Sequence, residues 1–482
     1  MLRNLLVAII ATAIAATVLA QDAPLFTSDF PPEEFAARRA KVYAAIGENG
    51  IALLQGAPSP EGYTRFRQTN ELYYLSGIEV PHAYLLLDGG QKRAALYLPH
   101  RHPARESSEG KLLSAEDADE VKKLAGVEAV FPQEMLSEHL ARIARIDPPR
   151  TLHTPFQPGE GMAVSRDLAM RRISDTSNDP WDGRGSREAA FLASLRARYP
   201  QFELRDLTPA LDRLRLIKSP REIALITKAT RLAGLALIEA ARSTEPGILE
   251  SELDAVAKYI FYRNGGQGDA YYSLIANGSN AYFPHYNAGK SRLRDGDLLL
   301  MDYAPDVGYY MSDITRMWPV NGKFSSDQRD LYNFYLGCYR AILDAIRPGV
   351  TPAAIKKEAL VKMDALLARS RFSKDIYTKG AKDFVDGYRR SSEYPGSTLG
   401  HWVGMATHDV GTDSGPLRPG MVFTIEPALR IPEERIYIRL EDLIVITEKG
   451  KDVPSLFVPM DVDGIEAMMK PEGMLQRYPR DH

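Results

Sequence analysis

The chain has 482 residues, with 60 Lys and Arg against 63 Asp and Glu, so its formal net charge is -3. This length exceeds what one hydrophobic core usually supports, and two or more domains are expected. The sequence has no basic stripe and no long run of one charge sign, which argues against nucleic acid as a partner. Cys338 is the only cysteine, so no internal disulfide can form. Its apolar helical surroundings predict a core residue.

The first twenty residues differ in composition from the rest of the chain. Arg3 is followed by an apolar run over residues 5–19, and Val18 and Ala20 fit the small-residue pattern of a signal peptidase site. The run is shorter than the ~20 residues that a membrane helix needs. A cleaved signal peptide over residues 1–20 is therefore favoured over an uncleaved anchor. We expect a periplasmic or secreted protein with no stable membrane span after cleavage.

The next part of the chain alternates between helical and strand patterns. Residues 34–170 are therefore predicted to form an α/β domain. The predicted elements are an amphipathic helix over residues 35–46 and buried strands over residues 51–54, 83–87 and 94–98. Residues 171–218 are expected to be a linker and loop region, because the stretch 171–187 is rich in Ser, Asp and Gly. Its composition fits a lid over an active site or a solvated surface loop.

A second domain is expected over residues 219–470. It begins with Ser219-Pro220-Arg221-Glu222, a capping-box pattern with proline at the first helical position. Two Pro-Gly pairs, at 246–247 and 348–349, each precede a predicted helix, and apolar strands are predicted over 298–301 and 421–425. The same order of helix and strand thus occurs twice, which predicts two related halves.

Each half also carries acidic residues in matching places. Asp302 and Glu426 both stand six positions after the glycine of a Leu-Arg-Xaa-Gly turn, and a second predicted strand then carries Asp313 or Glu441. A tight turn around Val307-Gly308 would place Asp302 opposite Asp313, where a metal ion would remove their repulsion. Taken alone, each aspartate favours an ordinary turn-flanking residue. For Glu441 the alternative is a surface salt bridge with Arg439, but the apolar continuation over residues 443–446 favours a buried strand.

Histidines add the sharpest signal. His401 and His408 lie within eight residues of each other, and His285 is the only other histidine between residue 219 and the C-terminal His482. Four carboxylates and one imidazole form a hard, oxygen-rich donor set that suits Mn(II), Co(II), Fe(II) or Zn(II). Two such ions, ~3.5–4 Å apart, could hold a hydroxide and polarise a carbonyl.

Several stretches resemble the pita-bread metallopeptidases, and within them the aminopeptidase P family most closely. The matching stretches are His285-Tyr286-Asn287, Met301-Asp302-Tyr303, Ser312-Asp313-Ile314-Thr315-Arg316, Gly400-His401-Trp402-Val403-Gly404, His408-Asp409-Val410-Gly411, Ile425-Glu426-Pro427 and Ile438-Arg439-Leu440-Glu441-Asp442. The run from Phe66 to Gly77 is similar to the start of that family's first domain. The resemblance implies an α/β (α+β) protein with a creatinase-like N-terminal domain and a pseudo-two-fold pita-bread catalytic domain.

The resemblance also implies a metal set. Asp302 would bind one of two divalent ions, Asp313 and Glu441 would bridge both, and His401 and Glu426 would complete the second. Manganese is the expected metal, with cobalt, zinc or iron as alternatives. The implied activity is hydrolysis of the peptide bond between a first residue and a following proline, through a metal-bridging hydroxide. A homodimer or homotetramer is expected.

Further roles follow from the same resemblance. Glu426 would take the proton from the bridging hydroxide, and Arg439 would orient Glu441 and its neighbours. His285 and His408 would contact the substrate carbonyl and the tetrahedral intermediate. The chain departs from the family pattern at Ser397, where a histidine is common, and at Ala428 and Arg430, where glycine and tyrosine are common.

These departures affect the expected substrate pocket. Ser397 and Arg430 are predicted to contact substrate, and Arg430 fits either a grip on a substrate carboxylate or a surface charge beside Glu433 or Glu434. A prolidase restricted to dipeptides, or a hydrolase of a small amide similar to creatinase, are alternative activities. A binding protein on an inactivated pita-bread scaffold is the alternative from another class, although such proteins lose the metal ligands that this chain retains.

Overall fold

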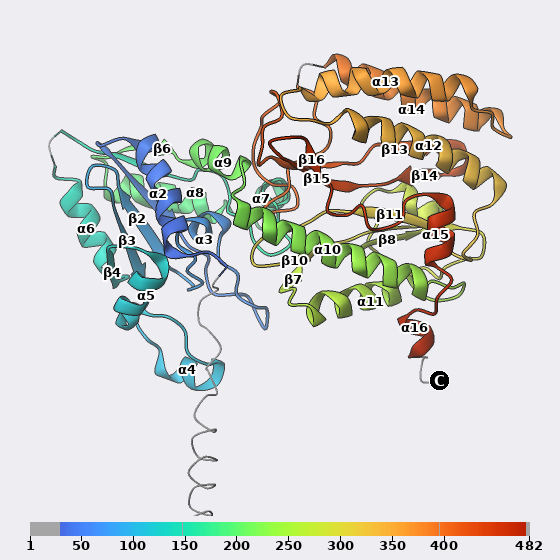
Figure 1. Ribbon diagram of the computed structural model, residues 1–482. Coiled ribbons are helices and arrows are strands. Elements are labelled where there is room, and N and C mark those ends of the chain that lie inside the picture. Colours follow the sequence, from blue (N-terminus) through green and yellow to red (C-terminus); the bar gives the residue numbers. More distant parts are fainter. Residues whose placement is uncertain (1–28, 147, 395, 479–482) are drawn as a thin grey trace, which may run out of the picture.

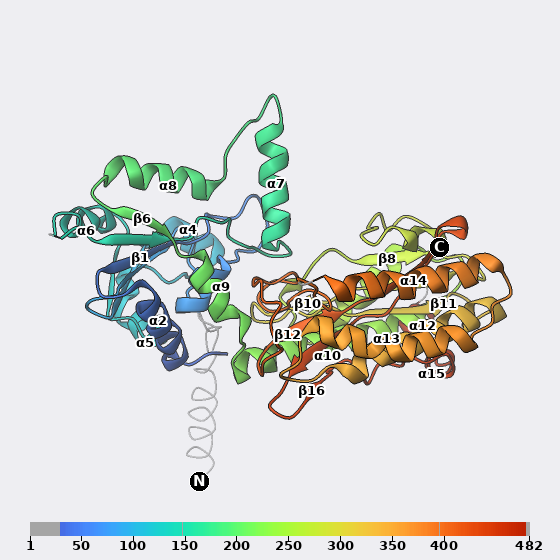
Figure 2. The same cartoon turned by 90° about the horizontal axis from the view of Figure 1, so that it is seen from above.

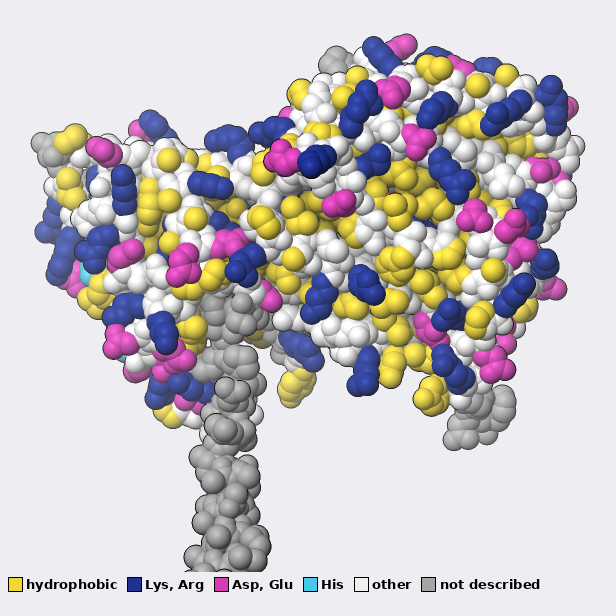
Figure 3. All heavy atoms as spheres, viewed as in Figure 1, with side chains coloured by type: hydrophobic (Ala, Val, Ile, Leu, Met, Phe, Trp, Pro, Cys, Tyr) yellow, Lys and Arg dark blue, Asp and Glu magenta, His cyan; other side chains and the backbone are white. Residues whose placement is uncertain are grey.

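The computed structural model describes residues 29–146, 148–394 and 396–478, which form two lobes (Figure 1). The expected signal peptide over residues 1–20 lies outside the described residues. No described helix combines the length and the apolar character that crossing a bilayer requires. On the face drawn in Figure 3, Lys and Arg side chains are interspersed with Asp and Glu, and hydrophobic side chains gather on the C-terminal lobe.

The N-terminal lobe is built on one six-stranded sheet with the order β4-β3-β2-β1-β5-β6. Its strands are β1 (Gly50–Gln55), β2 (Tyr84–Asp88), β3 (Arg93–Leu98), β4 (Ala129–Pro132), β5 (Thr151–Thr154) and β6 (Glu203–Asp206). The pairs β1–β2 and β2–β3 are antiparallel, and the remaining pairs are parallel. The three strands and the α/β character predicted for this part of the chain are confirmed.

Helices cover both faces of this sheet. They are α2 (Pro32–Ile46), α3 (Asn70–Ser76), α5 (Ala118–Ala125), α6 (Met135–Ile143) and α8 (Arg187–Arg198), with the 3-10 turn η1 (Ala115–Asp117). Helix α4 (Pro103–Glu109) buries no residue and projects away from the sheet (Figure 1). Because strand side chains alternate between faces, Ile51 and Leu53 of β1 pack with residues of α6 and α8, whereas Ala52 and Leu54 join the main core. Figure 2 shows α6 and α8 on the opposite side of the sheet from α2 and α5.

The segment 171–218, expected as a linker and loop region, is mostly regular structure. It contains the end of α7 (Arg166–Asn178), then α8, β6 and α9 (Thr208–Leu216). Strand β6 pairs with β5 and so completes the N-terminal sheet. Helix α7 buries only Ala169, so it lacks the apolar stripe by which a helix is recognised in a sequence. Within the polar stretch, only residues 179–186 form an irregular, largely exposed connection.

The C-terminal lobe packs helices around several small sheets (Figure 1). The helices are α10 (Pro220–Ser243), α11 (Glu250–Arg263), α12 (Ser326–Ala345), α13 (Pro352–Arg369), α14 (Asp375–Glu393), α15 (Val462–Met468) and α16 (Met474–Arg477), with 3-10 turns η2 (Gly278–Tyr282) and η3 (Pro432–Glu434). The predicted capping box starts α10, because Ser219 and Glu222 exchange side chain–backbone hydrogen bonds. Cys338 is buried in α12, as expected, and burial raises the pKa of its thiol to about 12.

The described strands of this lobe are β7 (Gly268–Asp269), β8 (Leu274–Asn277), β9 (Leu298–Asp302), β10 (Pro305–Asp306), β11 (Thr315–Pro319), β12 (Val422–Ile425), β13 (Ala428–Ile431), β14 (Ile436–Arg439), β15 (Asp442–Ile446) and β16 (Lys451–Asp452). They form four small sheets, and two of these sheets contain similar antiparallel pairs. Strand β9 pairs with β11, and β12 pairs with β15. The two pairs meet where Thr315 and Glu441 exchange backbone hydrogen bonds of 3.2 and 3.1 Å, so the carboxylates of both halves converge there.

One register differs from the prediction. The turn after β9 is closed by a bridge between Val307 and Tyr310, with positive φ at Gly308 and Tyr309. The two central residues are therefore one position later than expected, which shifts the pairing by two residues. Asp302 faces Thr315 and not Asp313. Asp313 still reaches the same site, from the residues just before β11.

Candidate metal centre

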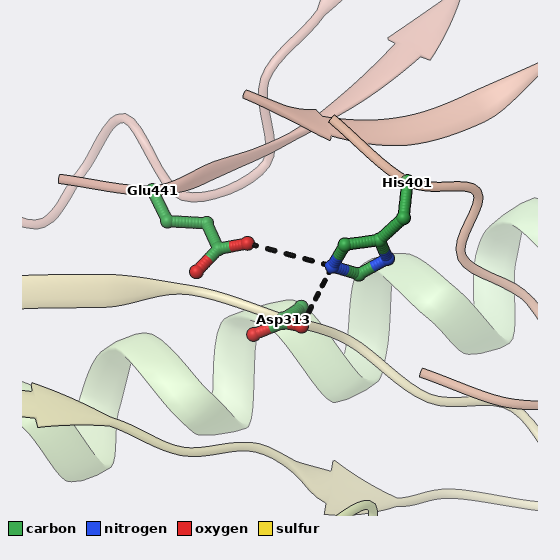
Figure 4. A group of neighbouring side chains, drawn as sticks. All are labelled: Asp313, His401 and Glu441. Carbon is green, nitrogen blue, oxygen red and sulfur yellow. Dashed lines mark ion pairs between the residues drawn. The ribbon is translucent and has the colours of Figure 1, made fainter. Parts of the chain in front are cut away.

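Three of the predicted ligands form a compact group between the two halves of the C-terminal lobe. Asp313, His401 and Glu441 each offer one ligand atom, and these atoms lie within 4.8 Å of one another. Figure 4 shows the His401 ring directed at both carboxylates. Its Nε2 lies 3.3 Å from Asp313 Oδ2 and 3.8 Å from Glu441 Oε1. The loop before β12 supplies the imidazole, and the junction of the strand pairs supplies the carboxylates.

The other two predicted ligands join this group. Glu426 Oε1 lies 3.5 Å from His401 Nε2, and Glu426 Oε2 lies 3.5 Å from Arg439 Nη1. Asp302 contacts Arg439 Nη2 through its second oxygen and accepts a 2.5 Å hydrogen bond from the Tyr271 hydroxyl. All five side chains named from the sequence are therefore brought together.

Tyr271 is a residue of the centre that the sequence did not reveal. Its hydroxyl contacts Asp302 Oδ1 and, at 2.7 Å, Asp313 Oδ1. Burial, followed by the charge of Asp302, raises the pKa of this phenol well above its ordinary value. Tyr271 follows the two-residue strand β7, and neither the repeat nor any motif in the chain marks this position. Single-sequence reasoning had no signal for it.

Burial and mutual repulsion disfavour the charged forms of the carboxylates in this centre. Burial, with the neighbouring Asp302, raises the pKa of Asp313 well above its ordinary value, and burial with Asp313 does the same for Glu441. Glu441 Oε2 accepts a 2.8 Å bond from the Thr315 hydroxyl, but its Oε1 is buried with no hydrogen-bond partner among the described residues. A buried acceptor without a partner is costly, and a divalent cation would satisfy it.

The imidazole of His401 is also oriented so that its Nε2 can bind a cation. His401 Nδ1 lies 3.2 Å from the carbonyl oxygen of Trp402, so Nδ1 carries the proton and the Nε2 lone pair faces the carboxylates. Four carboxylates and one imidazole nitrogen are the donors that Mn(II), Co(II), Zn(II) and Fe(II) accept. The residues of the centre therefore fit divalent metal, held by Asp302, Asp313, His401, Glu426 and Glu441.

Arg439 contacts two of the carboxylates directly. The resemblance implies that this guanidinium orients Glu441 and its neighbours; in the structure it donates a hydrogen bond to Asp302 and forms a longer ion pair, of 3.5 Å, with Glu426. Glu441 is fixed instead by Thr315. Burial alone would lower the pKa of Arg439, but the charges of Asp302 and Glu441 raise it. The side chain is therefore a permanent cation that offsets part of the carboxylate charge.

The two predicted catalytic histidines differ in their surroundings. The ring of His408 lies 4.2 Å from that of His401, and its Nδ1 is 2.9 Å from Asp167 Oδ2 on α7. Burial, with the neighbouring His401, lowers the pKa of His408 even though Asp167 opposes the shift. His285 is exposed in the loop after η2 and makes no hydrogen bond to a described residue. The structure thus brings His408 to the centre and leaves His285 in solvent.

Asp167 connects α7, whose C-terminal part belongs to the polar stretch, to the centre. It lies at the first turn of α7, and its other oxygen accepts a 2.5 Å bond from the Ser165 hydroxyl. The N-terminal end of α7 therefore contacts the edge of the centre. The exposed connection 179–186 lies at the opposite end of the helix.

Buried ion pairs fix the segment that carries His408. Asp409 Oδ1 lies 2.6 Å from Arg215 Nη2, and Asp409 Oδ2 lies 3.0 Å from Lys218 Nζ. Arg215 Nη2 is also 2.7 Å from Glu160 Oε2. Nearby, Asn70 of the N-terminal lobe donates to the carbonyl of Met405 at 2.9 Å. The loop between His401 and His408 is thus tied to both lobes.

Known proteins match both lobes. Residues 224–448 match metallopeptidase family M24, and residues 35–152 match the N-terminal domain of aminopeptidase P. The C-terminal lobe carries a domain of metallopeptidase family M24. With both matches in this order, the architecture of the chain is that of aminopeptidase P, and the predicted fold is confirmed. As a metallopeptidase of this family, it works with divalent metal.

Relatives of this M24 enzyme match it from end to end. The Xaa-Pro aminopeptidase of Haemophilus influenzae is 29% identical over 463 residues, which span 92% of this chain and 99% of the relative. The Xaa-Pro aminopeptidase of Escherichia coli is 29% identical over 92% of this chain and 98% of its own. A structure of Escherichia coli aminopeptidase P with the inhibitor Pro-Leu and a zinc-substituted structure with product both give a TM-score of 0.72 at 26% identity, covering 92% of this chain and 99% of theirs.

Ser397 and Arg430, two residues predicted to contact substrate, lie in different surroundings. Ser397 is buried, and its hydroxyl receives a 2.5 Å hydrogen bond from Lys356 of α13. Burial lowers the pKa of Lys356 to about 8. Arg430 is exposed on β13 and does not pair with Glu433 or Glu434, because these contact Lys379 and Lys374. Arg430 is thus an exposed surface charge that is not paired with either glutamate.

Proposed function

We propose that this protein is an aminopeptidase that hydrolyses the bond between a first residue and a following proline, using two divalent ions. The observation that carries the proposal is the compact group of Asp313, His401 and Glu441 with its unpartnered Glu441 Oε1. Glu426 joins this group through His401, and Asp302 joins it through Tyr271. Relatives named Xaa-Pro aminopeptidase over almost their whole length support the substrate class. A bound pair of ions would supply a water nucleophile at neutral pH and polarise the scissile carbonyl.

Glu426 is the residue we assign to accept the proton of the attacking water. Its side chain is 29% exposed, compared with 7% for Asp313 and 1% for Glu441, so it is the accessible carboxylate of the three. A general base must be able to reach the proton it removes. Arg439, paired with Glu426 and Asp302, holds both carboxylates in place.

His408 is assigned to proton movement at the substrate. With Nδ1–H directed at Asp167, the neutral ring presents Nε2 as an acceptor. Nε2 can take up a proton and then donate it to the oxygen that becomes negative or to the leaving nitrogen. His285 is assigned to the substrate side, where it is free to contact a bound peptide.

The proposal is tested with metal-stripped protein lacking residues 1–20. We expect no cleavage without metal and cleavage after Mn(II) is added, with Co(II), Zn(II) and Fe(II) as comparisons. Two tripeptides that differ only in proline or alanine at the second position measure the proline requirement. Equal cleavage of the two peptides would refute the proline preference, and Mn(II)-loaded protein that cuts neither would refute the activity.

A dinuclear site makes a second, independent measurement possible. Metal titration followed by calorimetry is expected to give two ions per chain. Asp313→Asn, which removes a charge from the proposed bridging position, is expected to weaken binding of both ions. A single ion in the wild-type protein would leave the hydrolase assignment in place and reject the dinuclear centre.

A further inference from the structure

Arg430 is an exposed cation without a carboxylate partner among the residues that the structure describes. Its guanidinium carbon lies 5.0 Å from the centroid of the Tyr437 ring and 5.9 Å from that of Tyr282. Both contacts are with aromatic faces, which hold a guanidinium without neutralising it. The acidic residues that follow it in the hairpin, Glu433 and Glu434, form ion pairs with Lys379 of α14 and with Lys374, the residue before that helix. Arg430 therefore keeps its charge available to an incoming anion.

The register of the β13–β14 hairpin directs this charge toward the metal centre. Ala428 pairs with Arg439, and Arg430 pairs with Tyr437. Because residues directly opposite each other and residues two apart share one face of a sheet, Arg430 lies on the same face as Arg439. One ring separates the two cations, since the Arg439 guanidinium lies 5.9 Å from the Tyr437 centroid. Arg439 itself contacts Asp302 and Glu426 of the centre.

The distance along the hairpin suits a short peptide. Two residues of a strand span roughly 7 Å, which separates Arg430 from the pair that contains Arg439. Two residues of an extended substrate beyond the scissile bond span about the same length. The amino end of the substrate is itself a cation, so Arg430 can attract only the leaving part of the peptide.

Resting on the proposed aminopeptidase activity, we propose that Arg430 receives a carboxylate on the leaving part of the substrate. The enzyme then prefers short peptides, above all tripeptides, whose C-terminal carboxylate reaches this guanidinium. An acidic side chain at the third residue of the substrate is a second possible origin of this carboxylate. Arg430 is thus a specificity-determining residue at the entrance to the metal centre.

The test compares one tripeptide with proline at its second position as the free acid and as the C-terminal amide. The third residue of both peptides is glutamine. A third peptide, an amide with glutamate at this position, shows whether an acidic side chain can supply the carboxylate that Arg430 binds. We expect kcat/KM for the acid to exceed that for the amide by about tenfold, the range of one charge-assisted hydrogen bond. The ratio should fall as salt is added, because the pair is exposed. If only the glutamate-containing amide is cleaved faster than the glutamine amide, Arg430 recognises an acidic side chain and not the C-terminal carboxylate.

Arg430→Gln should bring the acid-to-amide ratio close to one, and Arg430→Lys should restore part of it. Arg435→Gln is the matched control, because it removes the same charge from the turn end of the same hairpin. A ratio measured on one sample does not depend on how much of it is folded. Equal cleavage of acid and amide by the wild type, or an unchanged ratio in Arg430→Gln, would overturn this inference alone. Failure to cut any of the peptides with metal bound would overturn the proposed function and this inference together.

Discussion

The metal centre and a second buried cluster of charges meet at adjacent residues, His408 and Asp409, but they are compensated differently. The second cluster, which we call the interlobe cluster, combines four carboxylates with three cations: Glu71, Glu160, Asp212 and Asp409 with Arg166, Arg215 and Lys218. The metal centre also has four carboxylates, but Arg439 is the only permanent cation that pairs with them in the described part of the chain. The interlobe cluster is nearly neutral, whereas the metal centre carries a large negative excess.

The pKa shifts follow this difference. Burial would raise the pKa of Asp409, but Arg215 and Lys218 outweigh it and lower the pKa. In the metal centre, burial and neighbouring carboxylates act in the same direction and raise the pKa of Asp313 and Glu441. Buried carboxylates with matched cations indicate a structural contact, and buried carboxylates in excess indicate a place for a bound cation. The comparison therefore assigns one cluster to stability and the other to chemistry.

Glu441→Gln is expected to give the largest effect. The variant loses a metal ligand, and activity should fall by at least roughly 100-fold, because even residues that only orient ligands cost 10–100-fold. In the metal-free state, however, the variant should be more stable than the wild type, by roughly 1–3 kcal/mol, because one of several repelling buried charges is gone. Peptide assays with metal and urea unfolding with chelator present measure the two effects. A metal-free variant that is less stable than the metal-free wild type would contradict the assignment of excess charge.

Asp409→Asn, in contrast to Glu441→Gln, should lower the stability of the protein. Removing one partner from buried ion pairs leaves Arg215 and Lys218 uncompensated and should cost about 3–5 kcal/mol of unfolding free energy at pH 7. Asp413→Asn is the control, because Asp413 pairs with Arg418 at the surface at 2.9 Å and should matter by less than about 0.5 kcal/mol.

The pH dependence sharpens this prediction. The pKa of Asp409 is lower in the folded protein than in the unfolded chain. Its contribution to stability is therefore fully present above the unfolded pKa and is lost as the pH falls through the folded value. The stability difference between wild type and Asp409→Asn should narrow below about pH 4. A difference that stays constant from pH 7 to pH 3 would show that the carboxylate charge is not what stabilises the loop.

The same two clusters show what the sequence could and could not predict. Asp302, Asp313, Glu426 and Glu441 were recognisable because they recur at matching places in two halves of one domain. The pairing of Asp302 with Thr315 was missed, since a turn displaced by one residue changes the register of the whole pair. The repeat fixes which residues meet, and local turn geometry fixes which atoms face each other.

Contacts between distant segments could not be predicted in the same way. Tyr271 and Asp167 reach the centre from segments outside the repeat, and no pattern in one sequence links them to it. Residues 171–178 of helix α7, which carries Asp167 at its start, fall in the region predicted to be loop, because the helix buries a single residue. The periodicity that identifies helices reports burial, and a helix that is exposed on nearly all sides does not display it.

Asp167→Ala is expected to give the smallest effect, and this effect should be confined to the rate of the catalysed reaction. The carboxylate fixes the ring of His408 through a 2.9 Å contact, but its side chain is 54% exposed, so water can replace part of the interaction. We expect kcat to fall about tenfold with KM little changed, since orienting a catalytic imidazole acts on the transition state.

Asp175→Ala is the matched control for this prediction, because it removes the same charge from an exposed position on the same helix. Asp167→Asn keeps an acceptor oxygen at the Nδ1 position and should retain more activity than Asp167→Ala. Metal content and unfolding free energy should be unchanged in all three variants, in contrast to Glu441→Gln and Asp409→Asn. If Asp167→Ala lowers metal content or stability as much as it lowers kcat, α7 supports the fold of the centre, and the orienting role of Asp167 is wrong.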